Sequence, residues 1–314
     1  MFRHLFQKTK SILKRLKNSL ATTFGMSKSR QPQNMEGVSR YLDADDRRHY
    51  QQNGEDVYSV TTILDELGDG ENEGLKWWKY HNDGEGDNAD WKHLLEYKKN
   101  RGTLAHHAAM ADAYEQLNNG EQLWSGDETS SLYEVMDRVG DTSFLYSIMN
   151  DKGWVSDQES FENIVQKNED IELDEILCND LEYFSQEYER IAEERGINAE
   201  SLEAVEEMFI VPPNGEHNGY GGQADLVYRD PLTGGVVVAD LKTSSAVRDK
   251  HKYQAAAYAR AIEKTDNIDV DTVERAEIIR IHPDSEESEV YEFSDFDQYW
   301  SEFADTTKKM WAFK

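Results

Sequence analysis

The stretch GGQADLVYRDPLTGGVVVADLKTSSAVRDKHKYQAAAYA, residues 221–259, decides the fold of this chain. Residues 223–229 and 235–243 are short runs rich in strand-forming residues, and the segment Asp-Pro-Leu-Thr-Gly between them consists largely of turn-forming residues. This pattern predicts a β-hairpin. Residues 250–263 follow as a predicted helix whose small alanines allow it to lie close to a sheet.

Two acids and a lysine belong to this hairpin. The middle of its turn lies between Leu232 and Thr233. If the strands pair symmetrically about that point, Asp225 lies directly opposite Asp240, and cross-strand neighbours are about 5 Å apart at Cβ. That separation lets two carboxylates share one divalent cation. Lys242 projects from the same face as Asp240, because side chains two apart on a strand share a face. A one-residue bulge in the hairpin would break this arrangement.

Hydrolysis of a phosphodiester requires a cation on the phosphate, a water made nucleophilic near neutral pH, and a positive group that offsets the developing charge. Asp225, Asp240 and Lys242 can supply that set, so the hairpin predicts a metal-dependent nuclease centre. The alternative is a solvated hairpin with a surface ion pair, which any Asp-x-Lys tripeptide can form. The surrounding sequence must decide between them.

Composition limits the class of protein. A chain of 314 residues with 38% hydrophobic content can form a substantial core, so we expect a globular protein. Its net charge of −29 argues against a nucleic-acid partner, because attraction to phosphates dominates such binding. At molar salt, however, the Debye length falls to about 3 Å, and a carboxylate-rich surface stays soluble. We interpret the charge as that of a halophile's protein, with an ordinary acidic protein as the alternative.

The single cysteine, Cys178, excludes intramolecular disulfides, a multi-cysteine zinc site and a four-cysteine iron–sulfur cluster. No run approaches the roughly eighteen apolar residues of a membrane span, and the N-terminus lacks the apolar core of a signal peptide. We therefore expect a cytoplasmic protein with no membrane span and no iron–sulfur cluster.

The chain divides at about residue 57. Residues 1–56 are predicted to be a basic, disordered N-terminal extension followed by a linker, since the first thirty residues hold eight Lys or Arg and no acid. Their amphipathic pattern suits contact with a membrane or DNA, and a translation start further downstream is the alternative. Residues 57–314 are predicted to form one α/β domain that opens with a serine- or threonine-capped helix, with an inserted helical layer at about residues 118–179.

Further strands are predicted at residues 202–211, 275–282 and 287–293, and further helices at 90–100, 179–195 and 294–312, which together give a mixed sheet flanked by helices. Candidate site residues lie on these elements. His106, expected at the start of a helix, can bind Mg²⁺ or Mn²⁺, with a structural histidine as the alternative. Glu206, on the strand before the hairpin, can assist as a ligand or remain solvated. Thr243 and Ser244 can hydrogen-bond a phosphate.

Several short motifs follow one another along the chain: Tyr58-Ser-Val-Thr-Thr-Ile-Leu, Gly102-Thr103-x-x-His106, Glu206, Gly222-x-x-Asp225, Asp240-x-Lys242-Thr243-Ser244 and Gln254-x-x-x-Tyr258. This ordered set resembles the PD-(D/E)xK nuclease superfamily and, within it, the RecB-like exonuclease branch, which includes mitochondrial genome maintenance exonucleases and phage nucleases. The resemblance covers about residues 57–265. The chain departs from the pattern in having Ala224 where the branch has proline, and Asp-x-Lys where it often has Glu-x-Lys.

The resemblance implies a restriction-endonuclease-like core and a Mg²⁺- or Mn²⁺-dependent DNA exonuclease that acts on single strands or duplex ends in replication, recombination or repair. It also implies roles for the matching residues: His106, Asp225, Asp240 and the Leu241 carbonyl as metal ligands, Lys242 as the group that positions the attacking water, Glu206 as an assisting group, and Gln254 and Tyr258 as contacts to the site or the DNA. A non-catalytic nucleic-acid-binding protein with the same fold is the alternative. DNA versus RNA, polarity and homo-oligomer formation stay open.

Overall fold

A five-stranded mixed sheet forms the centre of the computed structural model, which describes residues 39–44, 47–67, 90–118, 173–265, 268, 270–284 and 286–311. Its strands lie in chain order: β4 (Leu202–Val211), β5 (Tyr220–Arg229), β6 (Val236–Lys242), β7 (Val273–His282) and β8 (Glu287–Phe293). Neighbouring strands are antiparallel except β6 and β7, which are parallel. The predicted hairpin, the strand before it and the two strands after it are therefore confirmed.

The order of strands follows from their sequences. β6 is a nearly continuous apolar run that is buried along almost its whole length, as a central strand with covered faces must be. β8 is charged and mostly exposed, which suits the edge of a sheet. A parallel pair needs a crossover connection, and the helix α9 (Asp249–Ile262) supplies it between β6 and β7.

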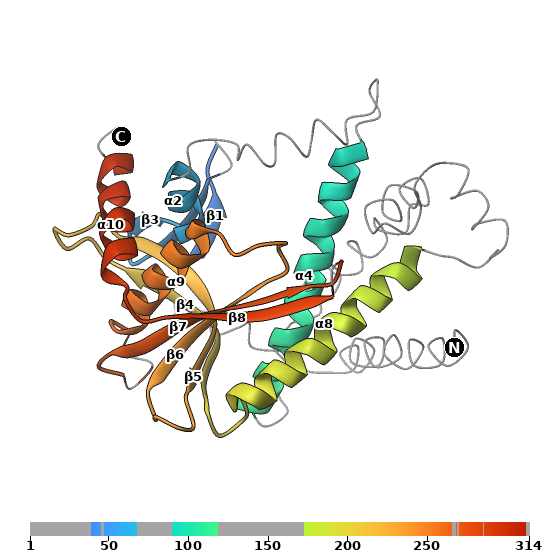
Figure 1. Cartoon of the computed structure of the whole chain (residues 1–314). Helices are drawn as coiled ribbons and strands as arrows, with labels where there is room; N and C mark the ends of the chain where they lie inside the picture. The colour runs from blue at the N-terminus through green and yellow to red at the C-terminus, as the bar shows by residue number, and fades with distance from the viewer. Residues whose placement is uncertain are drawn as a thin grey trace, which may run out of the picture.

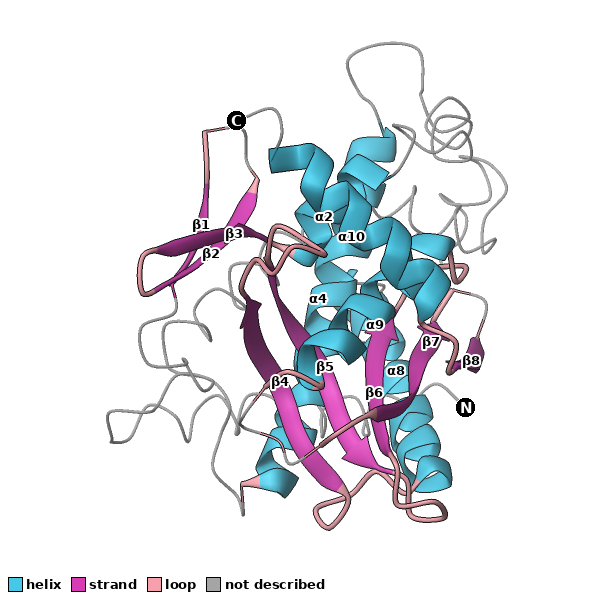
Figure 2. Cartoon of the chain, turned by 90° about the vertical axis from the view of Figure 1, so that its left-hand side faces the viewer, coloured by secondary structure: helices cyan, strands magenta, loops and turns pink. Residues whose placement is uncertain are grey.

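Helices cover both faces of this sheet (Figures 1 and 2). On one face, α4 (Asp90–Leu117) and α8 (Leu173–Arg195) pack on a core that includes Leu226, Tyr228 and Ile279. On the other face, α2 (Val60–Leu67), α9 and α10 (Asp297–Trp311) pack on a core that includes Val227 and Val238. The mixed α/β class with flanking helices is confirmed.

The helix α2 begins as predicted. The Thr62 N–H donates a hydrogen bond of 3.0 Å to the Ser59 hydroxyl, so Ser59 caps the helix. Ile63 and Leu64 are buried beneath it. In contrast, α4 differs from the prediction: it is one helix of 28 residues that continues through Gly102, and His106 lies well inside it rather than at a helix start.

The predicted disordered linker is wrong for residues 39–44 and 47–56, which belong to a folded segment that continues to residue 58. They form a second sheet of three antiparallel strands, β1 (Ser39–Leu42), β2 (Arg48–Gln52) and β3 (Glu55–Tyr58). The strands were missed because they are short and lack an alternating apolar pattern, and every residue of β1 is exposed. Two of them, β2 and β3, pack against β5 of the central sheet.

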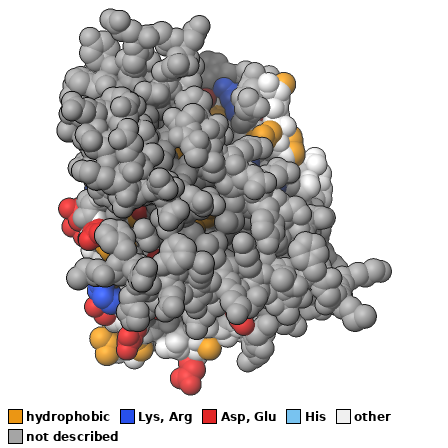
Figure 3. Space-filling view, turned by 90° about the vertical axis from the view of Figure 1, so that its right-hand side faces the viewer, with side chains coloured by type: hydrophobic (Ala, Val, Ile, Leu, Met, Phe, Trp, Pro, Cys, Tyr) orange, Lys and Arg blue, Asp and Glu red, His pale blue; other side chains and the backbone are white. Residues whose placement is uncertain are grey.

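Residues 1–38, the aromatic segment near residue 77 and most of the predicted insertion at 118–179 lie outside the described residues, but 173–179 belong to α8. Within the described part of the chain, no helix is long and apolar enough to cross a membrane. On the face drawn in Figure 3, acidic side chains are more prominent than basic ones among the described residues.

Candidate metal centre

The hairpin has the symmetric register that the sequence predicts. Leu226 pairs with Ala239, and Arg229 pairs with Val236. Main-chain pairing ends at the first of these pairs, so Asp225 and Asp240 are the next residues on their strands, where β5 and β6 begin to separate. The two acids therefore lie at the fork between two central strands.

Asp225 links three elements at this fork. Its Oδ2 accepts a hydrogen bond of 2.8 Å from the Leu241 N–H on β6. Its Oδ1 lies 3.1 Å from Nε2 of His106 on α4. One oxygen is thus fixed by the sheet and the other faces the helix, which holds the carboxylate in a defined orientation. Leu241 contacts this site through its N–H, and the role of its carbonyl as a metal ligand stays a prediction.

Glu206 approaches the same point from β4. The residues on either side of Glu206 pair with the residues on either side of Asp225, so the two acids face each other across β4 and β5. Glu206 has a left-handed backbone with φ of 55°, which costs about 1–3 kcal/mol for a residue with a side chain. The Gln223 side chain donates a hydrogen bond of 3.1 Å to the main-chain carbonyl of Glu206. Strain of this kind is typical of functional positions.

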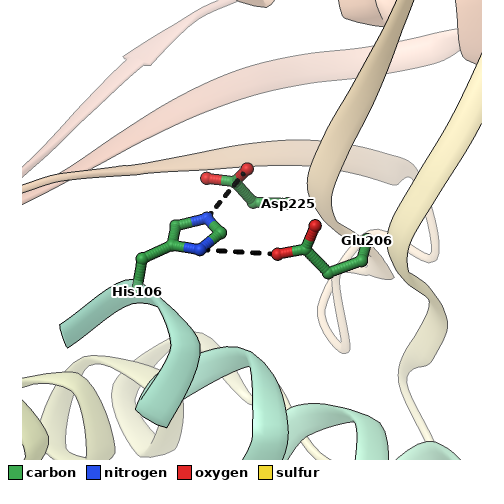
Figure 4. A group of neighbouring side chains, drawn as sticks. All are labelled: His106, Glu206 and Asp225. Atoms are coloured by element: carbon green, nitrogen blue, oxygen red, sulfur yellow. Dashed lines mark ion pairs between the residues drawn. The ribbon is translucent and has the colours of Figure 1, made fainter. Parts of the chain in front are cut away.

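His106 completes a cluster with the two acids (Figure 4). Its Nδ1 lies 3.4 Å from Glu206 Oε1, opposite the contact of Nε2 with Asp225. One potential ligand atom from each of the three residues lies within 4.8 Å of the others, so the group could hold a metal ion. Burial lowers the pKa of His106, but Asp225 and Glu206 outweigh it and raise that pKa to about 9. The cluster attracts positive charge.

The close approach of α4 to the sheet explains how His106 reaches the acids. A Cβ atom on Gly102 would lie 2.7 Å from Oγ1 of Thr243, just after β6. Glycine in a helix interior costs about 1 kcal/mol relative to alanine. Here it lets the helix lie against the end of β6, and His106 follows one turn later on the same face. This contact gives a physical reason for the Gly102-Thr103-x-x-His106 motif.

Asp240, which is buried, and Lys242, which is partly exposed, form an ion pair beside the cluster. Asp240 is 1% exposed, and its Oδ2 lies 2.5 Å from Lys242 Nζ. Its Oδ1 is buried and has no hydrogen-bond partner among the described residues. Burial raises the pKa of Asp240 to about 6, against the lowering effect of Lys242. The third residue of the cluster with His106 and Asp225 is therefore Glu206. Asp240, which was predicted as a metal ligand, pairs with Lys242 instead.

Gln254 and Tyr258 lie on one face of α9, as their spacing predicts, and the Gln254 amide donates a hydrogen bond of 2.7 Å to the Tyr258 hydroxyl. Tyr258 is almost completely buried. Burial raises its pKa well above the usual value, and the nearby charges of Asp240 and Asp225 raise it further. Tyr258 therefore keeps its proton next to the two acids.

Two pockets adjoin the cluster, and His106 lines both. The larger, of about 570 Å³, is also lined by Lys242, Thr243 and Ser244, and the smaller, of about 180 Å³, by Glu206, Asp225, Gln254 and Tyr258. The predicted site residues other than Asp240 thus surround two adjoining spaces. Asp240 lines neither pocket and is buried on β6, near Tyr258 of α9.

Sequence reasoning missed six lysines and arginines around these pockets, of which Lys98 and Arg101 in the larger pocket pair with acids. Lys99 and Arg248 line the larger pocket, and Arg40 and Arg48 line the smaller one. Lys99 precedes Gly102 by less than one helical turn, and Arg248 follows soon after the hairpin, so proximity to the motifs was an available signal. No local pattern could bring Arg40 and Arg48 to the site, because their strands were not predicted.

No protein-family model and no curated protein matches this chain. Among solved structures, one that is similar to part of it is titled "Crystal structure of SSO0001", at 18% identity and a TM-score of 0.28. The match covers 43% of this chain and 60% of the other, so the chain spans less than two thirds of that protein's length. A TM-score this low carries no argument about fold or function.

Proposed function

We propose that this chain is a Mg²⁺- or Mn²⁺-dependent deoxyribonuclease with a restriction-endonuclease-like core, acting as an exonuclease of the RecB-like branch. One observation carries the proposal: ligand atoms of His106, Glu206 and Asp225 lie within 4.8 Å of one another, beside the Asp240–Lys242 ion pair. A carboxylate-rich cluster with an adjacent lysine suits hydrolysis of a phosphodiester. The order of the sequence motifs supports the same activity.

In this proposal His106, Glu206 and Asp225 hold the metal ion, with Asp240 next to them. When bound, the ion would neutralise charge on the scissile phosphate and make a water molecule more acidic. Lys242, held by Asp240, would hydrogen-bond the attacking water from the wall of the larger pocket and offset the developing negative charge. The hydroxyls of Thr243 and Ser244 would donate to phosphate oxygens from the same wall.

The test is a cleavage assay with the purified protein in high KCl and either Mg²⁺ or Mn²⁺. We expect it to shorten single-stranded or duplex DNA labelled at the 5′ or 3′ end, and the two labels report the polarity. Covalently closed circular DNA should stay intact if the enzyme needs an end. An RNA strand of the same sequence tests the sugar preference.

Lys242→Ala should reduce the cleavage rate on the order of 10²- to 10³-fold, because the variant lacks a charge-stabilising group at the reacting phosphate. Lys252→Ala is a matched control, since Lys252 pairs with Asp249 at the start of α9 and lines neither pocket. Intact DNA under all these conditions, or Lys242→Ala cutting as fast as wild type, would refute the proposal. Binding of DNA without turnover by the wild type would favour the non-catalytic alternative.

A further inference from the structure

The three-stranded sheet β1–β3 is fixed against the metal centre. A Cβ atom on Gly221 of β5 would lie 2.7 Å from Cβ of Tyr50, so β2 packs directly on the strand that bears Asp225. Ser59 forms a bridge with the same glycine. The Arg48 N–H donates a hydrogen bond of 3.0 Å to the Thr62 hydroxyl, and the Arg48 carbonyl accepts one of 2.9 Å from the Ser59 N–H. These contacts hold β2 against β5 and the start of α2.

This docking brings two arginines to the acids. Arg40 lies directly across from Tyr50 in the β1–β2 pairing, and Arg48 lies two residues before it on β2. Both arginines line the smaller pocket together with Glu206 and Asp225. Burial raises the pKa of Tyr50, and the two guanidinium groups partly offset that effect, which requires them to be near its ring. Both arginine residues are otherwise exposed.

Arg40 and Arg48 differ from neighbouring arginines in having no carboxylate partner among the described residues, which is unusual for so acidic a chain. Arg47, the residue directly before Arg48, forms an ion pair of 3.2 Å with Glu66. Arg275 contacts three carboxylates. Among the described residues, by contrast, no carboxylate lies within ion-pair distance of Arg40 or Arg48, although Glu206 and Asp225 line the same pocket. Both acids contact His106 instead. Arg40 hydrogen-bonds the Tyr50 side chain, and neither guanidinium group has its charge paired by a carboxylate among the described residues, which leaves that charge to attract an anion into the pocket.

We propose that Arg40 and Arg48 bind a backbone phosphate of the nucleic-acid substrate next to the scissile one. This inference rests on the nuclease function proposed above. A guanidinium suits a phosphate because its parallel N–H groups match two oxygens. The substrate strand crosses the cluster at His106, which lines both pockets, and has basic side chains on either side: Arg40 and Arg48 in the smaller pocket, and Lys99 and Arg248 in the larger.

The experiment compares Arg40→Ala, Arg48→Ala and the double variant with Arg47→Ala. Arg47 is a close control because it precedes Arg48 directly, is partly exposed and lines neither pocket. Initial rates on a labelled single-stranded oligonucleotide should show KM raised about tenfold by each pocket variant, with kcat changed less than about threefold, since one phosphate contact strengthens binding by roughly one order of magnitude. Arg47→Ala should match wild type.

A second readout separates phosphate binding from a structural role. In a Lys242→Ala background, which should bind while cutting on the order of 10²- to 10³-fold more slowly, fluorescence anisotropy of the same oligonucleotide gives its affinity at several KCl concentrations. Each lost phosphate contact should reduce the slope of log K against log [KCl] by about 0.7. Arg48→Lys should retain that slope while binding more weakly, because lysine keeps the charge and loses the fork geometry.

The outcomes separate this inference from the function on which it rests. If wild type cleaves DNA and the double variant matches Arg47→Ala in both KM and salt slope, only the role of the two arginines is refuted. A reduced affinity with an unchanged salt slope would also refute it, since that result indicates loss of structure rather than of a phosphate contact. If wild type neither binds nor cuts any nucleic acid, both proposals are refuted.

Discussion

Asp240 and Glu277 are buried carboxylates on neighbouring strands of one sheet, yet their surroundings differ. Glu277 is fully buried on β7, where it accepts a hydrogen bond of 2.8 Å from the Tyr228 hydroxyl and one of 2.9 Å from Arg275 Nε. Arg195, on α8, lies 3.4 Å from it. Asp240, on β6, has Lys242 as its ion-pair partner, and one of its oxygens has no hydrogen-bond partner among the described residues.

The two acids lie almost side by side. In the β6–β7 register, Glu277 is opposite Ala239, the residue just before Asp240. Glu277 faces α8, and Asp240 lies near Tyr258 on α9. Burial of a carboxylate is costly unless hydrogen bonds and opposite charges compensate it. Full compensation at Glu277 is what a structural role requires, whereas incomplete compensation beside a cluster of ligand atoms is typical of a functional site.

Asp240→Asn should therefore reduce activity strongly and stability little. We expect the cleavage rate to fall on the order of 10²- to 10³-fold, because Lys242 loses the carboxylate that orients it. Because burial raises the pKa of Asp240 and water reaches Lys242, replacing this carboxylate with an amide should change the free energy of unfolding by less than about 1 kcal/mol. Cleavage assays and urea denaturation measure the two quantities. A variant that retains activity would show that Asp240 is as structural as Glu277.

Glu277→Gln should have the opposite effect. Arg275 and Arg195 would lose a fully buried partner, so the free energy of unfolding should fall by about 3 kcal/mol. Because Glu277 faces away from the cluster, kcat of the folded variant should stay within about twofold of wild type. Urea denaturation and rates measured well below the melting temperature test both parts. Unchanged stability would mean that the contacts to Asp230 and Glu274 suffice for Arg275.

Added Mn²⁺ should stabilise wild type by binding to the cluster of His106, Glu206 and Asp225, and this effect should not depend on Glu277. At about thirty times its Kd, a bound ion stabilises the folded state by about 2 kcal/mol. Thermal denaturation should show this increment in wild type and in Glu277→Gln, although the latter melts at a lower temperature. Asp225→Asn should lose it, because that substitution removes a charged ligand from the cluster. Excess EDTA should reverse the shift in every case, and an equal shift in Asp225→Asn would place the metal elsewhere.

The parts of the fold that could be predicted are those with a local signal. The turn chemistry of residues 230–234 predicted the hairpin, and its symmetry predicted the register that places Asp225 and Asp240 at the fork. The strand before the hairpin and the helices α8, α9 and α10 followed from periodicity and from turn or capping residues. Each of these signals lies within a few residues of the feature it predicts.

The features that could not be predicted depend on contacts between distant segments. Strands β1 and β2 bury little besides His49 and Tyr50, and their anchor, Gly221, is far along the chain. The proximity of Glu206 to His106 depends on a left-handed backbone inside a strand, for which a glutamate gives no hint. The motifs indicated which residues matter, and the packing determines which of them meet.

The continuation of α4 through Gly102 was not predicted from the sequence either. A substitution at this glycine should have the smallest effect of those considered. Gly102→Ala should favour the helix by propensity but force its new Cβ against Thr243, whose Oγ1 would be 2.7 Å away. A small displacement of His106 from the acids should reduce kcat by about five- to tenfold, as small misplacements in active sites do. Thr243→Ala removes the obstructing atom, so adding Gly102→Ala to it should cost less than adding it to wild type. Equal costs in this double-mutant cycle would show that Gly102 acts without Thr243. That result would leave the position of His106 to be explained by other contacts of α4, such as the buried ion pair between Arg101 and Asp180.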